Sequence, residues 1–343
     1  MKTLNPLQLN NLLRLMVIYS VLVFLIFPGN PSLAAPQKND IQSLSVNHTK
    51  PIRLIVPWPP GGTADTLARI VSAPLAIQLE QNIVIDNRVG ASSTVGTAMV
   101  ANVTPNGQTL LYADVSTMTI NASFYPKLAY NTLTDLTPIS KVGVTPLIMV
   151  VNSNGSMHSV QELIALSKAN PGRYNFSSAG NGSTLHLGAE MFLARAGISW
   201  IHVPYKGGSP AISALLSSEV QMNCSGLIAA MPHIQVGSLR ALATTHPIRL
   251  SSLPEVPALA ELYPGFQVLL VNGLLGPKGL PDPVVNKLRE ALLKVLASKD
   301  LIARFEALGV EPQSSTPSEL FEWMKGEISR YAKIVKQTGI HAD

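Results

Sequence analysis

Short strand-like and longer helix-like segments alternate along most of the chain, and this alternation limits the possible folds more than any other feature. Helix-like segments carry apolar residues at a spacing of three and four, and strand-like segments are brief apolar runs between turns. The expected strands are 52–56, 83–86, 109–112, 147–151, 174–177, 220–224, 241–244 and 268–275. The expected helices are 63–78, 94–103, 159–169, 184–196, 210–217, 283–297 and 317–338. This order is typical of an α/β protein with largely parallel sheets.

The first residues predict a secretory signal peptide. The apolar run Leu15–Phe27 is too short for a bilayer-spanning helix, which needs roughly 20 apolar residues. Ser32 and Ala34 put small residues at the −3 and −1 positions of a signal peptidase site. We therefore expect a signal peptide at 1–34, cleaved after Ala34, and a polar lead at 35–50. An uncleaved N-terminal anchor is the alternative.

The composition describes an exported protein with few charges. Charged residues make up 13% of the chain, about half the usual share. Removal of Lys2 and Arg14 with the signal peptide lowers the formal charge from +5 to +3, and no basic run remains, so nucleic acid is not an expected partner. Cys224 is the only cysteine, which excludes an internal disulfide and predicts a buried, inert thiol.

The segment Trp58–Arg69 indicates an anion site. It joins an expected strand to an expected helix through two prolines and the glycines Gly61 and Gly62. The first N–H groups of a helix lack partners, and the helix dipole places partial positive charge there. Glycine lets a ligand approach the backbone, because no Cβ is in the way. A tight turn without a ligand is the alternative.

Four further polar loops occur along the chain, three after expected strands and one after the segment 202–204. They are Asn87–Thr94, Ala113–Thr117, Ser178–Thr184 and Tyr205–Gly208. In open α/β sheets, ligands bind beyond the carboxyl ends of the strands. Loops rich in N–H and O–H donors suit a carboxylate better than an apolar ligand. One such loop alone is more often a capped turn, whereas their recurrence favours a binding site.

Enzyme and metal motifs do not fit the chain. The run 180–185 begins like a dinucleotide fingerprint, but Leu185 stands where the last glycine belongs. G-x-S-x-G, H-E-x-x-H, paired cysteines and an EF-hand loop are all missing from the sequence, and the seven histidines are dispersed. We therefore predict no catalytic residue, no cofactor and no metal, and interpret His186 as structural. A secreted hydrolase using a serine of 177–183 is an alternative that lacks a positioned base.

A series of sequence blocks points to a known family. The blocks are Pro51–Arg69, Asp86–Arg88, Leu133–Pro138, Ser177–Leu187, His202–Gly207, Met231–Ile234 and Leu239–Ala243. In their order and spacing the chain resembles the substrate-binding receptors of tripartite tricarboxylate transporters, the Bug-type (Bordetella uptake gene) periplasmic solute receptors. The resemblance runs from about Pro51 to His341.

The resemblance implies a type II periplasmic-binding-protein fold, in which two α/β lobes are joined by a hinge with the ligand cleft between them. Lobe one is expected at 51–150 plus 271–343, and lobe two at 151–270. It also implies a monomeric periplasmic receptor, not an enzyme, that binds a small carboxylate (a di- or tricarboxylate or a related organic acid). Its partners would be the membrane subunits of the transporter. A receptor that feeds a signalling partner would look the same in sequence.

In such receptors a Pro-Pro-Gly-Gly loop of one lobe and a Ser/Thr/Gly loop of the other hold the ligand carboxylate, partly through water. Within the first loop, Asp65 is expected to act on the loop and the helix start, because a carboxylate would repel an anion. The predicted ligand-binding residues are Pro60, Gly61, Gly62, Thr63, Asp65, Ser93, Ser116, Thr117, Ser178, Asn181, Gly182, Ser183, Thr184, Tyr205 and Lys206.

The chain also departs from the family pattern. Many members carry an aspartate just after the strand at 220–224, where it can hold a ligand's amino group, but this chain has Ser225-Gly226. An amino-acid ligand is therefore less expected than a non-amino carboxylate. Val271-Asn272 replaces a frequent aromatic pair, so the pocket is expected to differ there. Ser92 and Ser93 replace two glycines and add hydroxyl groups.

Overall fold

The computed structural model describes residues 50–338, so the predicted signal peptide and nearly all of the polar lead lie outside the described residues. The strands are β1 (Ile52–Val56), β2 (Ile83–Asn87), β3 (Thr109–Asp114), β4 (Leu136–Asn152), β5 (Asn175–Ser178), β6 (Ile201–Pro204), β7 (Met222–Gly226), β8 (Leu239–Thr244), β9 (Leu269–Pro277) and β10 (Glu311–Pro312). The helices are α2 (Thr63–Leu79), α3 (Thr94–Ala101), α4 (Val115–Phe124), α5 (Val160–Ala169), α6 (Thr184–Ala196), α7 (Gly208–Leu216), α8 (Leu227–Gln235), α9 (Leu259–Leu262), α10 (Asp282–Leu296), α11 (Lys299–Ala307) and α12 (Pro317–Thr338).

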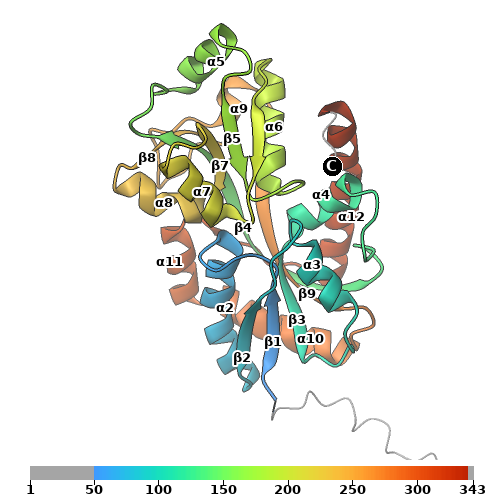
Figure 1. Ribbon diagram of the computed structural model, residues 1–343. Helices are drawn as coiled ribbons and strands as arrows, with labels where there is room; N and C mark the ends of the chain where they lie inside the picture. Colours follow the sequence, from blue (N-terminus) through green and yellow to red (C-terminus); the bar gives the residue numbers. More distant parts are fainter. Residues whose placement is uncertain (1–49, 339–343) are drawn as a thin grey trace, which may run out of the picture. The chain divides into compact units, whose positions relative to one another are not determined.

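The strands form one hydrogen-bonded path in the order β2-β1-β3-β9-β4-β7-β5-β6, with β8 and β10 also paired to β4 (Figure 1). Strand β1 runs parallel to β2 and β3, and β5 runs parallel to β6 and β7. Each of these two parallel groups is built from alternating strands and helices, as the sequence predicts. They lie at opposite ends of the path, with β9 and β4 between them.

Strand β4 links the two groups. Its residues 136–146 pair with β9, whereas residues 147–152 pair with β7 and β8. The chain returns at the start of β9, where the Val268 N–H donates to the Thr245 carbonyl oxygen. The backbone thus passes between the two groups twice, at β4 and at β9. The boundaries of the two lobes stay a prediction.

The expectation of largely parallel sheets is wrong for the middle of the path. Strand β9 is antiparallel to both β3 and β4, and β4 is antiparallel to β7 and β8. Strand β4 also begins at Leu136, well before the expected 147. Irregular pairing with β9 near Pro138 and Gly143 interrupts the alternation that identifies a strand. Among the described residues, α4, α8, α9, α11, β6 and β10 were not expected from the sequence.

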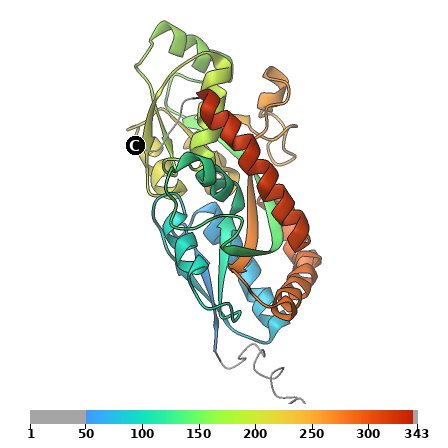
Figure 2. The ribbon, with the colours of Figure 1, turned by 90° about the vertical axis from the view of Figure 1, so that its right-hand side faces the viewer.

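Helices cover the sheet and bring the groups together. Helix α2 buries Leu67, Val71 and Leu75 at helical spacing, and it packs against α10. Helix α12 contacts α4, β4 and α6, so it runs alongside elements of both groups (Figure 2).

Cys224 on β7 is fully buried, which confirms the prediction of a buried thiol. In residues 50–338 no helix combines the length and the apolar character that a membrane span requires.

Candidate functional site

The loop between β1 and α2 leaves the first N–H groups of α2 without a side-chain cap. Gly62 is the N-cap residue, in an extended conformation with φ −78° and ψ 169°. Gly61 has φ +78°, a left-handed conformation that glycine adopts without a steric penalty. The free N–H groups carry the positive end of the helix dipole.

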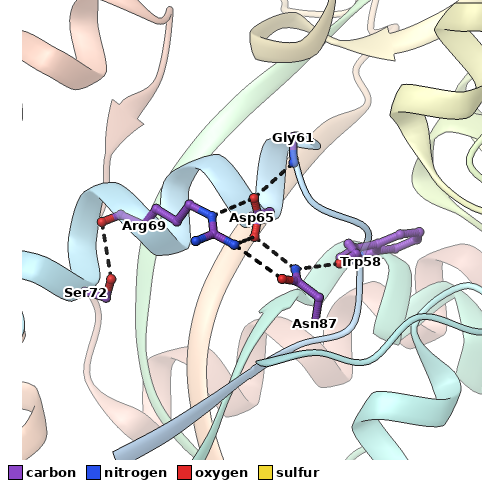
Figure 3. Close-up of polar contacts among 6 residues, drawn as sticks. All are labelled: Trp58, Gly61, Asp65, Arg69, Ser72 and Asn87. Atoms are coloured by element: carbon purple, nitrogen blue, oxygen red, sulfur yellow. Dashed lines mark hydrogen bonds and ion pairs between the residues drawn. The ribbon is translucent and has the colours of Figure 1, made fainter. Parts of the chain in front are cut away.

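The carboxylate of Asp65 fixes this loop through hydrogen bonds (Figure 3). Its Oδ2 accepts hydrogen bonds from the Gly61 N–H at 3.0 Å and from Arg69 Nε at 2.9 Å. Its Oδ1 accepts from Arg69 Nη2 and Asn87 Nδ2, both at 2.9 Å, and Asn87 Nδ2 also donates to the Trp58 carbonyl oxygen. Burial disfavours the charge, but the bonds from Arg69, Asn87 and Gly61 outweigh it and hold the pKa of Asp65 below its usual value. Asp65 is therefore hydrogen-bonded to the loop, and its effect on ligand binding stays a prediction.

A cavity that is partly open to solvent lies where several helices begin; we call it the helix-start cavity. The lining is mostly apolar, with a few polar groups. The lining residues are Trp58, Pro59, Gly62, Thr63, Ala64, Asp114, Ala179, Leu185, Gly208, Ser225, Gly226, Ala229, Leu270 and Asn272.

The starts of five helices meet at the helix-start cavity. Those of α2, α7 and α8 reach it through Gly62, Gly208 and Gly226, and none of the three has a side-chain cap. Asp114 caps α4, and Leu185 lies in the first turn of α6. Three sets of free N–H groups therefore lie around one cavity. Each helix start is equivalent to about half a positive charge, so the cavity favours an anion.

Glycine is required where these helix starts meet the loop before α2. A Cβ on Gly226 would collide with the side chain of Thr63, and one on Gly207 would collide with the ring of Pro59. The backbone of Gly226 and of Gly207 therefore packs directly against the side chains of Thr63 and Pro59. This close packing places the starts of α7 and α8 next to the start of α2.

Asp114 is the only charged side chain among the residues that line the helix-start cavity. Its carboxylate accepts hydrogen bonds from the Thr117 N–H at 3.1 Å, Thr117 Oγ1 at 2.6 Å and Thr184 Oγ1 at 3.2 Å. The Thr184 N–H in turn donates to Thr117 Oγ1 at 3.1 Å, which ties the start of α6 to the start of α4. Burial raises the pKa of Asp114 to about 6, although these hydrogen bonds lower it.

A second cavity adjoins the first and shares Trp58 and Ala179 with it; we call it the loop cavity. Its walls come from the loops after β2, β5 and β6. Ser92 Oγ donates to the Asn181 carbonyl oxygen at 2.6 Å, which joins two of these loops. The lining residues are Pro57, Trp58, Val89, Gly90, Ala91, Ser92, Ser93, Tyr125, Ala179, Gly180, Asn181, Pro204, Tyr205 and Lys206.

Comparison with known proteins identifies the family. The model of the tripartite tricarboxylate transporter family receptor matches residues 67–340. The chain belongs to this family. This receptor is 35% identical to the protein BugT of Bordetella pertussis over 331 residues, which cover 96% of the chain and 98% of BugT. The resemblance that the sequence blocks indicate is confirmed.

Solved structures confirm the fold class. The periplasmic binding protein BugD is 30% identical and superposes with a TM-score of 0.82, covering 86% of this receptor and 99% of BugD. An R. palustris protein solved with adipate is 30% identical, with a TM-score of 0.82, over 85% and 98% of the two chains. MatC of Rhodopseudomonas palustris, solved with bound malate, is 29% identical, with a TM-score of 0.79, and the match covers 83% of this receptor and 99% of MatC.

A serine–histidine pair in this receptor does not have the setting of a catalytic pair. Ser178 Oγ lies 2.7 Å from His202 Nε2, but Ser178 is fully buried and lines neither cavity. Burial and the stacked His186 ring lower the pKa of His202 to about 3, which makes it a weak base. Within residues 50–338, no group of His, Cys, Asp and Glu is arranged to hold a metal ion.

The predicted site residues fall into four sets. The helix-start cavity is lined by Gly62 and Thr63, and the loop cavity by Ser93, Asn181, Tyr205 and Lys206. Pro60 and Gly61 are exposed on the loop before α2. The remaining predicted residues are buried and line neither cavity: Asp65, Ser116, Thr117, Ser178, Gly182, Ser183 and Thr184.

Several buried predicted residues hold other parts of the site. Ser183 caps α6 by accepting from the His186 N–H at 3.2 Å. Ser116 Oγ donates to the Leu269 carbonyl oxygen and accepts from the Val271 N–H, which fixes α4 against β9. Direct contact of these side chains with a ligand stays a prediction.

Three polar residues that line the helix-start cavity were not among the predicted site residues: Asp114, Ser225 and Asn272. Asp114 precedes a helix that was not expected, so its capping role was not apparent. Ser225 and Asn272 belong to strands, where alternation alone does not tell which face meets a cavity. A sequence signal for both residues does exist, because the chain departs from its family pattern at Ser225-Gly226 and at Val271-Asn272.

Proposed function

We propose that this receptor binds one small carboxylate in the helix-start cavity. The observation that carries the proposal is the meeting of three uncapped helix starts, those of α2, α7 and α8, at one mostly apolar cavity. Free N–H groups and helix dipoles stabilise a carboxylate, while the apolar walls suit a short hydrocarbon chain. The adipate and malate bound by related receptors support a ligand of this class.

The carboxylate would be held by backbone N–H groups at the start of α2, together with the hydroxyl group of Thr63. Gly62 leaves room for this approach, and Asp65 fixes the loop through Gly61 and Arg69. Thr117, Ser183 and Thr184 would act on the site indirectly by fixing the starts of α4 and α6. Ser93, Asn181, Tyr205 and Lys206 would face ligand or solvent at the adjoining loop cavity.

The biological role would be uptake. A periplasmic receptor of this family would pass its ligand to the membrane subunits of a tripartite tricarboxylate transporter. The predicted signal peptide at 1–34 would direct export to the periplasm, where the receptor would act as a monomer without catalysing a reaction.

A thermal-shift panel of mono-, di- and tricarboxylates, amino acids, sugars and divalent metals tests this proposal. A ligand at a hundred times its dissociation constant stabilises the protein by about 2.7 kcal/mol. For a chain of this size that corresponds to roughly 5–10 °C in melting temperature. At least one carboxylate is expected to produce such a shift. A shift with a sugar or metal and none with any carboxylate would overturn the proposal.

A further inference from the structure

Asn272 has an unpaired side chain at the helix-start cavity. It lies on β9, directly opposite Asp114 on β3, and the residue is 1% exposed. Among residues 50–338, neither its Nδ2 nor its Oδ1 has a hydrogen-bond partner. It also lines the cavity. Buried polar atoms without partners are uncommon and costly, which marks Asn272 as a group that a ligand completes.

The chemistry of the amide limits what that ligand can present. Asn272 Nδ2 needs an acceptor, and Oδ1 needs a donor. Water meets both needs because it donates and accepts. A ligand group that displaces water has to do the same, or one atom of the amide stays buried and unpaired. Hydroxyl and carboxamide groups do both. A carboxylate only accepts, and an ammonium group only donates.

The neighbouring Asp114 further restricts the group that a ligand can present to Asn272. Its carboxylate receives hydrogen bonds from the Thr117 N–H, Thr117 Oγ1 and Thr184 Oγ1, and also from the backbone of Ser116. Four donors use about all the lone pairs of a carboxylate, so none is left for a ligand ammonium group. The cavity lining contains no Lys, Arg or His. A second ligand carboxylate beside Asp114 would therefore meet no cationic side chain that offsets the repulsion between the two carboxylates.

We infer that Asn272 is a specificity-determining residue, which selects carboxylates whose second polar group is a neutral hydroxyl or carboxamide. This inference rests on the proposed function, because the first carboxylate is the one held at the start of α2. Such a ligand satisfies both halves of the cavity: the charged end meets the free N–H groups, and the neutral end meets both atoms of the Asn272 amide.

Titration calorimetry at pH 7.5 with four-carbon acids that differ only at the far end tests the inference. The acids are succinamate (carboxamide), 4-hydroxybutyrate (hydroxyl), succinate (carboxylate), 4-aminobutyrate (ammonium) and butyrate (methyl), with the five-carbon series beside them. The carboxamide or hydroxyl acid of at least one series is expected to bind about 10- to 100-fold more tightly than its carboxylate and ammonium counterparts.

Two variants of Asn272 make the test specific. Asn272→Leu keeps the volume but removes both polar atoms, so the selectivity should vanish while the affinity for butyrate stays within about threefold or improves. Asn272→Asp only accepts when ionised, so it should shift the preference toward 4-aminobutyrate. Melting temperatures of the free variants serve as the control for folding.

The outcomes separate this inference from the proposed function. If succinate is the tightest ligand, or if Asn272→Leu keeps the selectivity of the wild type, the inference is wrong and carboxylate binding stands. If no acid of either series binds and other carboxylates fail as well, the proposed function itself is wrong.

Discussion

The substitution Gly62→Val separates binding from folding at the start of α2. Gly62 has φ −78° and ψ 169°, in the extended region that suits a β-branched residue. A Cβ there would meet only the Pro59 carbonyl oxygen, at an ordinary 3.5 Å. Valine is a poorer N-cap than glycine by about 1 kcal/mol, and reduced freedom of the unfolded chain offsets part of this. The melting temperature should therefore fall by no more than about 4 °C.

The same substitution should damage binding far more. Gly62 lines the helix-start cavity, so the valine side chain would occupy space through which a ligand reaches the free N–H groups. Each lost hydrogen bond to a charged group costs roughly 1.5–3 kcal/mol, or about a 10- to 100-fold loss of affinity. Titration calorimetry with the carboxylate that gives the largest thermal shift measures this loss.

Gly61→Val is the matched control, one residue away. Gly61 has φ +78°, and a residue with a side chain pays about 1–2 kcal/mol or more for that conformation. We expect this variant to lose stability, in contrast to Gly62→Val. If Gly62→Val folds normally and binds the carboxylate as tightly as the wild type, the ligand does not lie at this helix start.

Three further predictions test the surroundings of the site. Asp65→Asn should lower the free energy of unfolding by about 2 kcal/mol at pH 7; the share of Arg69 in this value is small because its side chain is half exposed. The pKa of Asp65 is lowered in the folded protein, so the stabilisation is present above the ordinary pKa of 3.8 and is lost as the pH falls through the folded pKa. Denaturation curves of wild type and variant should therefore converge in acid. The pH dependence at Asp114 has the opposite sign, because burial raises its pKa to about 6. As the pH rises from about 4 to 6, the wild type should lose up to about 3 kcal/mol of unfolding free energy relative to Asp114→Asn. A pH-independent difference between the two proteins in urea denaturation would contradict this. Burial raises the pKa of Cys224 to about 12, so a thiol reagent should react with it only after unfolding, and rapid labelling of the native protein would show an open core.

The elements with clear periodicity could be predicted from the sequence. Strand β1 and helices α6 and α12 begin and end at the expected residues, because their apolar spacing and their flanking turn residues agree. Helix α4 could not be predicted in this way. Eight of its ten residues are buried, so it has no polar face and no helical periodicity.

The loops of the site were predictable, but the atoms that meet the cavity were not. Glycines and helix starts in the sequence point to Gly62 and Thr63, which line the cavity. Hydroxyl groups such as those of Thr117 and Thr184 look like ligand donors in the sequence, yet they bond to Asp114 in the fold. Whether a donor faces a ligand or a neighbouring side chain depends on tertiary contacts, which local patterns do not contain.

The most direct test of the account is a crystal structure of the receptor with the carboxylate that gives the largest thermal shift. We expect electron density for the carboxylate in the helix-start cavity, with an oxygen atom at hydrogen-bonding distance, about 2.7–3.2 Å, from backbone N–H groups at the start of α2 and of α7 or α8. A ligand seated only in the loop cavity, or a carboxylate without contact to any of these helix starts, would contradict it.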